Sequence, residues 1–267
     1  MTHAMTDTPV VIFCGGQGTR MRGDTLTKKE LVEIGGQPIL WHVMRIFSTF
    51  GFNHFVLPLG YGADQIKRYF LQYEAFTRDF SLWVGDGAEE TPLHFHGRAQ
   101  HPTWRIDLVD TGLYTDKASR IARVADYLTG ARFFATYGDG VGNVNVGALL
   151  AFHRAHGRLA TITAIQPRHY QYGTLEADEN GLVTHYEQYP VLPYWINGGF
   201  MVFERDVLPL MAASENVALE TEVLPRLVAQ GQLMLFRHHG FWQSMDTLKD
   251  AMDLEERWKK DAPWKVW

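Results

Sequence analysis

An apolar run from Val10 to Cys14 ends directly in a glycine-rich loop, and this junction most restricts how the chain can fold. The β-branched and aromatic residues of the run predict a buried strand. Apolar residues at helical spacing then predict an amphipathic helix over 38–50, followed by a strand over 55–59 and a helix over 63–73. Alternation of strand and helix in this order favours a largely parallel sheet with right-handed crossovers.

The rest of the chain continues the same mixture of strands and helices. We expect further strands at 82–84, 93–95, 105–109, 132–136, 160–165, 181–186 and 199–203, and helices at 118–128, 148–156, 219–229 and 248–260. No internal repeat or Pro/Ser-rich linker divides the chain. We therefore expect a flexible N-terminal extension, residues 1–8, followed by a single α/β domain over residues 9–267.

Composition narrows the classes of function. The formal net charge of −5 over 267 residues, with no long basic stretch, argues against nucleic acid as a partner. The sequence has no apolar stretch of membrane-spanning length, and its N-terminal residues lack the apolar core of a signal peptide. Cys14 is the single cysteine, so no internal disulfide can form. These features predict a cytoplasmic protein without a membrane partner.

The glycine loop fits neither of two common phosphate-binding patterns. A Walker loop would need a lysine after Gly23, where the chain has Asp24, and a dinucleotide fingerprint would need glycine at Met21. Two interpretations remain open. The loop is a simple turn between strand and helix, or its backbone N–H groups form an anion cradle to which Arg20 adds charge.

A series of motifs resembles the sugar-1-phosphate nucleotidyltransferases. The motifs occur in order along almost the whole chain: GGQGTRM (15–21), Lys29, VEIGGQPILWHVM (32–44), VDTG (109–112), TYGDGV (136–141), FHRAHGRLATITA (152–164), YGTL (172–175), INGGF (196–200), GFWQSMDT (240–247) and APWKVW (262–267). Trp41, His42 and the final APWKVW are similar to the glucose-1-phosphate cytidylyltransferase branch of this family.

The resemblance implies a fold and a reaction. The fold is a Rossmann-like α/β/α domain of the nucleotidyltransferase (GT-A) type, with a mainly parallel central sheet and a small lobe for sugar binding and oligomerisation. The reaction is Mg²⁺-dependent transfer of CMP from CTP to a sugar 1-phosphate, with α-D-glucose 1-phosphate the expected acceptor and CDP-glucose and pyrophosphate the products. The branch also implies a homo-oligomer, commonly a hexamer.

The resemblance assigns the triphosphate side of the site to the glycine loop and to residues further along. Arg20 and Lys29 would be catalytic, and the nucleotide would be bound by Phe13, Cys14, Gly15, Gly16, Gln17, Gly18, Thr19, Arg20, Thr111, Thr115, Arg120 and Gly138. The family pattern has prolines on both sides of the catalytic lysine, where this chain has Lys28 and Glu30. Either Lys28 or Lys29 could therefore face the site, and either could be a solvated surface residue. Arg120 has a surface alternative as well.

Asp139 and Asp246 match the two metal-binding carboxylates of the family. Carboxylate oxygens suit Mg²⁺, and Asp139 follows an apolar strand, where ligands of open α/β sheets bind. Each residue also has a simpler interpretation. Asp139 could form an Asp-Gly turn, and Asp246 could cap the helix that follows it.

The sugar side is assigned to Tyr172, Gly173, Glu187, Gln188, Asn197 and Gly198. Gln188 stands where the family has a lysine that holds the sugar's phosphate, so a formal charge is missing at this position. The same loop contains the aromatic residues Tyr189, Tyr194 and Trp195, which could stack on a ligand or pack on a neighbouring subunit. A different phosphorylated small molecule is therefore an alternative acceptor. A nucleotide-binding protein without catalysis is a third hypothesis.

Overall fold

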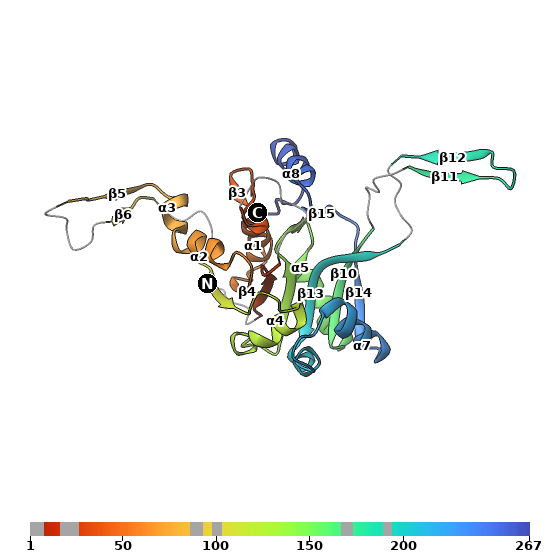
Figure 1. Ribbon diagram of the computed structural model, residues 1–267, viewed down its shortest axis with the longest axis horizontal. Coiled ribbons are helices and arrows are strands. Elements are labelled where there is room, and N and C mark those ends of the chain that lie inside the picture. The colour runs from red at the N-terminus through yellow and green to blue at the C-terminus, as the bar shows by residue number, and fades with distance from the viewer. Residues whose placement is uncertain (1–7, 17–26, 86–92, 98–102, 167–172, 189–193) are drawn as a thin grey trace.

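The computed structural model describes residues 8–16, 27–85, 93–97, 103–166, 173–188 and 194–267. A seven-stranded sheet with the order β14-β10-β13-β8-β1-β4-β7 forms its centre (Figure 1). These strands are β1 (Val10–Phe13), β4 (His54–Leu59), β7 (Arg105–Asp110), β8 (Arg132–Tyr137), β10 (Ala160–Ile165), β13 (Ile196–Glu204) and β14 (Leu233–His238). Strand β13 runs antiparallel to β8 and β10, and the other neighbouring strands of the described sheet pair in parallel.

Helices and short turns cover the sheet. They are α1 (Ile39–Thr49), α2 (Ala63–Leu71), α3 (Tyr73–Thr77), α4 (Lys117–Arg123), α5 (Val146–His156), α6 (Leu208–Met211), α7 (Leu224–Ala229), α8 (Leu248–Lys260), the 3₁₀ turns η2 (Lys29–Leu31), η3 (Ala125–Tyr127) and η4 (Arg205–Val207), and the π-helical turn η5 (Leu219–Val223). In the described part of the chain, no helix combines the length and apolar character needed to cross a membrane.

Strand β1 separates two apolar cores. Val10 and Ile12 belong to a cluster that includes buried residues of α1, α5 and α8, whereas Val11 and Phe13 belong to a cluster with α4, α6 and α7. Both faces of the strand are therefore covered, which explains its continuous apolar run. The layers confirm the predicted α/β fold with a mainly parallel sheet.

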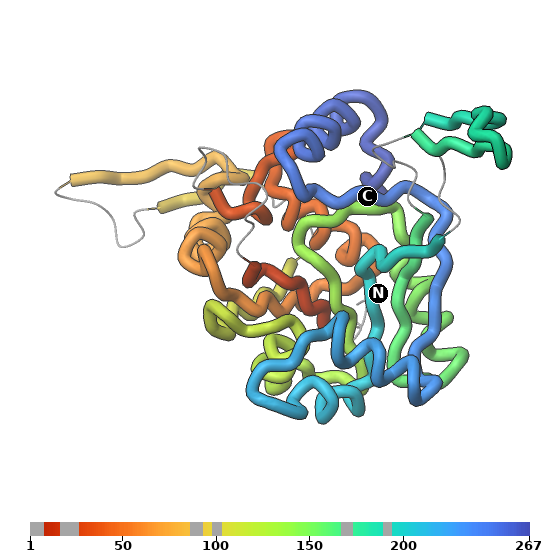
Figure 2. The backbone as a smooth tube through the Cα atoms, turned by 45° about the vertical axis from the view of Figure 1, so that its right-hand side comes forward, coloured from red at the N-terminus to blue at the C-terminus, as the bar shows by residue number. Residues whose placement is uncertain are grey.

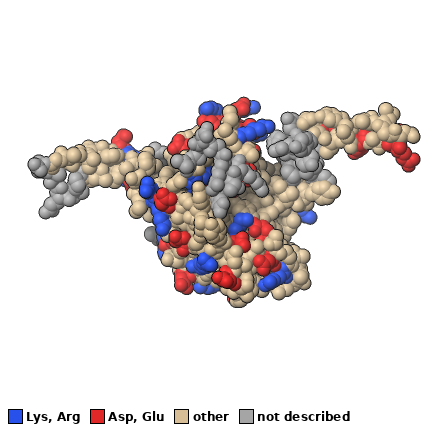
Figure 3. Space-filling view, viewed as in Figure 1, with Lys and Arg blue, Asp and Glu red and all other residues tan. Residues whose placement is uncertain are grey.

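Four two-stranded sheets lie outside the central one. They pair β2 (Glu33–Ile34) with β3 (Gln37–Pro38), β5 (Phe80–Leu82) with β6 (Leu93–Phe95), β9 (Gly140–Gly142) with β15 (Trp242–Ser244), and β11 (Thr174–Ala177) with β12 (Val183–Glu187). The pairs β5–β6 and β11–β12 stand away from the central sheet in two views (Figures 1 and 2). Acidic and basic side chains are interspersed over the body on the face shown in Figure 3.

The C-terminal segment packs on α1 through a buried histidine. The Trp264 indole N–H donates to Nδ1 of His42 at 3.3 Å, so His42 carries its proton on Nε2 and donates it to the Ile34 carbonyl at 2.8 Å. Both side chains are fully buried. Burial lowers the pKa of His42 to about 4, because a charged imidazole would lose its hydration there.

Candidate active site

The pairing of β9 with β15 brings the two predicted metal-binding carboxylates together. Asp139 directly precedes β9, and Asp246 lies two residues after β15. Gly140 and Ser244 are register partners, and the Met245 backbone N–H donates to the Asp139 carbonyl at 2.8 Å. Two segments distant in the sequence are therefore fixed side by side at the end of β8.

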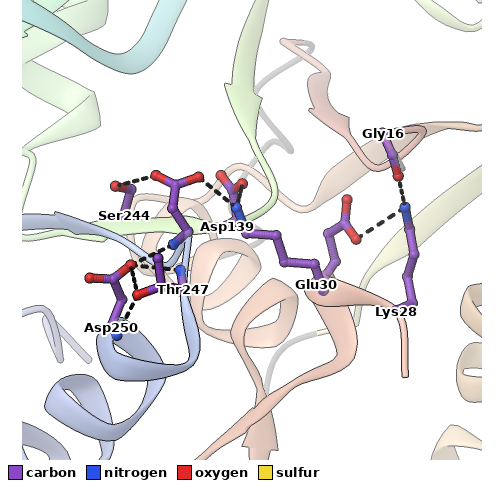
Figure 4. Close-up of polar contacts among 9 residues, drawn as sticks. Gly16, Lys28, Glu30, Asp139, Ser244, Thr247 and Asp250 are labelled. Atoms are coloured by element: carbon purple, nitrogen blue, oxygen red, sulfur yellow. Dashed lines mark hydrogen bonds and ion pairs between the residues drawn. The ribbon is translucent and has the colours of Figure 1, made fainter. Parts of the chain in front are cut away.

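The start of α8 holds Asp246 in place. Thr247 is the N-cap residue and forms a capping box with Asp250, whose carboxylate also accepts the Asp246 backbone N–H at 3.0 Å (Figure 4). The Ser244 hydroxyl donates to Asp246 Oδ2 at 3.0 Å. The interpretation of Asp246 as the helix cap is therefore wrong, because Thr247 has that role and Asp246 keeps a carboxylate oxygen for other partners.

Lys29 lies between the two carboxylates. Its Nζ is 2.7 Å from Asp139 Oδ2 and 2.9 Å from Asp246 Oδ1, and its side chain is 11% exposed. Burial alone would lower the pKa of Lys29, but the charges and hydrogen bonds of Asp139 and Asp246 outweigh it and raise the pKa. A charged ammonium is thus held at the acidic pair.

The same two carboxylates fit a divalent metal. Their oxygens already converge on one cation, and Mg²⁺ is commonly held by one or two carboxylates together with substrate phosphates and water. The described residues contain no cluster of three or more His, Cys, Asp or Glu side chains suited to a metal. Asp139 and Asp246 would thus need oxygens from substrate or water to complete a magnesium site.

The Lys28 side chain faces the Gly16 carbonyl and Glu30, and not the carboxylates that contact Lys29. It is 3% exposed, its Nζ donates to the carbonyl of Gly16, and it lies 3.3 Å from Glu30 Oε2 (Figure 4). Burial raises the pKa of Glu30 although the Lys28 charge opposes this shift. The surface interpretation is therefore wrong for both lysines. Lys28 ties the start of the glycine loop to η2, and Lys29 faces the carboxylates.

Arg120 is buried, which makes its surface interpretation wrong as well. The residue lies on α4 and is 4% exposed. Its guanidinium donates to Thr111 Oγ1 at 2.6 Å and to three carbonyls, those of Leu59, Gly15 and Leu113. It therefore joins the ends of β1 and β4 to the segment after β7. Thr115 also donates to the Thr111 carbonyl, so these predicted nucleotide-binding residues form one network. Direct contact with a nucleotide stays a prediction.

The residues at the start of the glycine loop are held by burial and by a backbone hydrogen bond. Phe13 and Cys14 are buried, burial raises the pKa of the Cys14 thiol, and the Gly138 N–H donates to the Phe13 carbonyl at 3.3 Å. Gly16 is exposed. Five predicted site residues lie outside the described residues: Gln17, Gly18, Thr19, Arg20 and Tyr172.

A pocket of about 220 Å³ opens beside the carboxylates. It is lined by Asp139, Asp246, Asn197, Gly198, Tyr137 and Trp242, among others. Two predicted sugar-side residues therefore share a cavity with the predicted metal pair. Tyr137 and Trp242 were missed by the sequence analysis, although both lie inside motifs that it quoted. The Trp242 indole N–H donates to the Gly198 carbonyl at 2.7 Å, so it shapes the wall of the pocket.

The structure does not bring the other sugar-side residues that it describes into this pocket. Glu187 ends β12 and is exposed, and Gln188 follows it. The Tyr186 hydroxyl donates to Gln188 Oε1, so Gln188 interacts within its own hairpin. Gly173, just before β11, packs against the same tyrosine, because a Cβ there would lie 2.6 Å from the Tyr186 hydroxyl oxygen. Glu187 is the last residue of the projecting β11–β12 pair (Figure 1), and Gly173 and Gln188 directly flank its two strands.

Comparison with known proteins identifies the family. A family model described as nucleotidyl transferase matches residues 9–260. The chain belongs to the nucleotidyl transferase family. This nucleotidyltransferase is 40% identical to a glucose-1-phosphate cytidylyltransferase of Salmonella typhi over 261 residues, covering 96% of this chain and 98% of that protein. The glucose-1-phosphate cytidylyltransferase of Salmonella typhimurium shows the same identity and coverage.

A solved structure shares the fold. HddC from Yersinia pseudotuberculosis, complexed with GMP-PN, aligns with a TM-score of 0.68 and 18% identity over 94% of this chain and 99% of HddC. At this identity the likeness concerns the fold alone.

Proposed function

We propose that this nucleotidyltransferase makes CDP-glucose and pyrophosphate from CTP and α-D-glucose 1-phosphate. The observation that carries the proposal is the convergence of Lys29, Asp139 and Asp246 beside a pocket that also contains Asn197. The 40% identity to glucose-1-phosphate cytidylyltransferases over almost the full chain supports the choice of both substrates.

In the proposed reaction a phosphate oxygen of the acceptor attacks the α-phosphorus of CTP. The bond from that phosphorus to the bridging β-phosphate oxygen breaks, and pyrophosphate leaves with the electron pair. Lys29 would neutralise charge on the phosphates, and no covalent enzyme intermediate is needed. Asp139 and Asp246 would hold Mg²⁺, which supplies further charge neutralisation when bound. The glycine loop would bind the triphosphate, and Asn197 the sugar.

Pyrophosphate release from CTP and glucose 1-phosphate tests the proposal. Asp139→Asn is expected to abolish metal-dependent turnover. Lys29→Met is expected to lower kcat by roughly 10²–10³, the usual effect of removing one group that stabilises transition-state charge. Asp126→Asn and Lys259→Met are the matched controls, because both side chains are exposed and lie outside the pocket. Full activity in Asp139→Asn would refute the metal assignment.

A different phosphorylated acceptor is a second candidate, and Gln188 is the observation that favours it. This position carries no charge for a phosphate, and its side-chain oxygen accepts a hydrogen bond from Tyr186. A panel of nucleoside triphosphates and phosphorylated acceptors separates the candidates. Release of pyrophosphate with another acceptor but not with glucose 1-phosphate would favour this second function.

We also propose that the chain forms a homo-oligomer, with a hexamer as the expected form. The hairpins that stand away from the sheet carry exposed apolar side chains, including Leu82 at 56% and Leu175 at 63% exposed. Burial of such surface favours association. Light scattering on the purified protein measures the oligomer directly, and a monomer at micromolar concentration would contradict this proposal.

A further inference from the structure

A chain of hydrogen bonds runs from the pocket to a charged pair outside it. Asn197 Nδ2 donates to the Tyr137 hydroxyl at 3.1 Å, and this hydroxyl donates to Glu220 Oε1 at 2.8 Å. Lys117 Nζ donates to the same Glu220 oxygen at 2.6 Å. The four residues come from β13, β8, η5 and α4. Glu220 and Lys117 are not among the residues that line the pocket.

We call the four hydrogen-bonded residues Asn197, Tyr137, Glu220 and Lys117 the relay. The chemistry of its members fixes the direction of each hydrogen bond. A carboxylate only accepts hydrogen bonds, so Glu220 must receive the Tyr137 proton. The Tyr137 oxygen is then free to accept from the Asn197 amide. Burial alone would raise the pKa of Glu220, but Lys117 and the Tyr137 hydroxyl lower it below its ordinary value. Glu220 is therefore a permanent acceptor at neutral pH.

Asn197 is held from its other side as well. Its Oδ1 accepts the Gly199 backbone N–H at 2.8 Å, which fixes which atom of the amide is oxygen. The register of β13 against β10 is irregular at this point, and Gly199 (φ +74°) and Phe200 (φ +40°) are left-handed. Such irregularities re-aim side chains, and strain of this kind is concentrated at functional sites. Among the described residues, one amide N–H and one oxygen lone pair of Asn197 are not used by these two hydrogen bonds and are available to a ligand.

Glu220 lies in a turn with a rare helical form. The turn η5 is π-helical, a form that is often found at functional sites. Its first and last residues, Leu219 and Val223, are buried, and Glu222 of the same turn accepts the Ala218 backbone N–H at 2.9 Å. Two glutamates of one turn thus have different partners. Glu222 stabilises the backbone of the turn, and Glu220 contacts Tyr137.

We propose that Glu220 is a positioning residue for the acceptor subsite, because it orients the Tyr137 hydroxyl and thereby the Asn197 amide, which would bind the sugar. The proposal rests on the function proposed above and deepens it. Without Glu220, the Tyr137 hydroxyl can turn its proton elsewhere and the ring loses one anchor. Asn197 then keeps its bond to Gly199 but is held less firmly at its nitrogen.

Steady-state kinetics of Glu220→Ala test the proposal. We expect KM for glucose 1-phosphate to rise roughly three- to tenfold, the equivalent of one lost hydrogen bond, whereas kcat and KM for CTP change less than twofold. Glu220→Gln should restore KM to within twofold of the wild type, because its amide oxygen still accepts from Tyr137. Lys117→Met should also stay within twofold, since the acceptor remains.

Glu222→Ala is the matched control, because it disturbs the same turn without touching Tyr137. An equal rise in acceptor KM in Glu222→Ala, or no rescue by Glu220→Gln, would overturn the proposal. If the wild type releases no pyrophosphate with any acceptor, the proposed function fails, and calorimetric binding of glucose 1-phosphate then tests the relay. Weaker binding by Glu220→Ala alone would support it, and absence of binding to the wild type would overturn it.

Discussion

Replacing Lys28 should destabilise the protein far more than replacing an exposed lysine. The side chains of Lys28 and Glu30 are 2% and 8% exposed, and Glu30 Oε2 has no hydrogen-bond partner among the described residues beyond this ion pair. Lys28→Met would leave the Glu30 carboxylate buried without a countercharge. Removal of one partner from a buried pair costs about 3–5 kcal/mol. For a chain of this size, each kcal/mol lowers Tm by roughly 2–4 °C.

The sign of the pH dependence follows from the same pair. Burial already raises the pKa of Glu30, and loss of the Lys28 charge should raise it further. An acid with a raised folded pKa binds its proton more tightly in the folded state. The destabilisation of Lys28→Met should therefore be smallest at acidic pH and grow as the pH rises through the folded pKa of Glu30.

Urea denaturation at pH 5 and pH 8 measures both effects. Lys259→Met is the control, because its ion pair with Glu255 at 3.2 Å is exposed and should contribute at most about 1 kcal/mol. The double variant Lys28→Met with Glu30→Leu removes both charges and should regain most of the loss. If the double variant is as unstable as the single one, Lys28 acts mainly through the Gly16 carbonyl, and the reasoning from the buried charge is refuted.

Two further predictions concern the buried histidine and the glycine loop. His42 has a folded pKa of about 4, so the wild type should lose about 1.4 kcal/mol of stability per pH unit, about 3 kcal/mol in total, as the pH falls from 6.5 to 4. Between pH 6.5 and 4, the free energy of unfolding of His42→Phe should therefore fall less steeply with pH than that of the wild type, by the contribution of this one proton. An equal slope in both proteins would contradict the assignment. Gly15→Ala should cost about 1–3 kcal/mol, since its Cβ would lie 2.3 Å from Arg120 Cζ. Gly16→Ala, with no described residue within 4 Å of its Cβ, should keep stability but raise KM for CTP, and equal stability losses would contradict the close packing of Arg120.

The fold was largely predictable because its signals are local. The apolar run at β1 and the helical spacing in α1 require only neighbouring residues, and both elements lie where they were expected. Strand β14 was missed, because its mixed sequence LMLFRH is only partly buried at the edge of the sheet. Its partner β10 supplies the pairing that the local pattern does not indicate.

The site was less predictable, because its geometry depends on distant contacts. Strands β9 and β15 have three residues each, too short for a periodic signal, yet their pairing brings Asp139 to Asp246. The family resemblance assigned Glu187 and Asn197 to one pocket, whereas in the structure Asn197 lines the pocket and Glu187 lies on an exposed hairpin. Glu220 had no motif signal, since the role proposed for it depends on its hydrogen bond with Tyr137.

The departure from the family's proline–lysine–proline pattern has a physical compensation in this chain. Lys28 has φ −59°, a backbone angle that a proline would also adopt. A proline there would lose the bond from the Lys28 backbone N–H to Gln65 Oε1 at 2.8 Å, and it could not reach the Gly16 carbonyl. The ion pair with Glu30 then allows the charge of Lys28 to be buried. Lys28 and Glu30 therefore compensate each other's buried charge on the two sides of Lys29, whose own side chain faces the carboxylates.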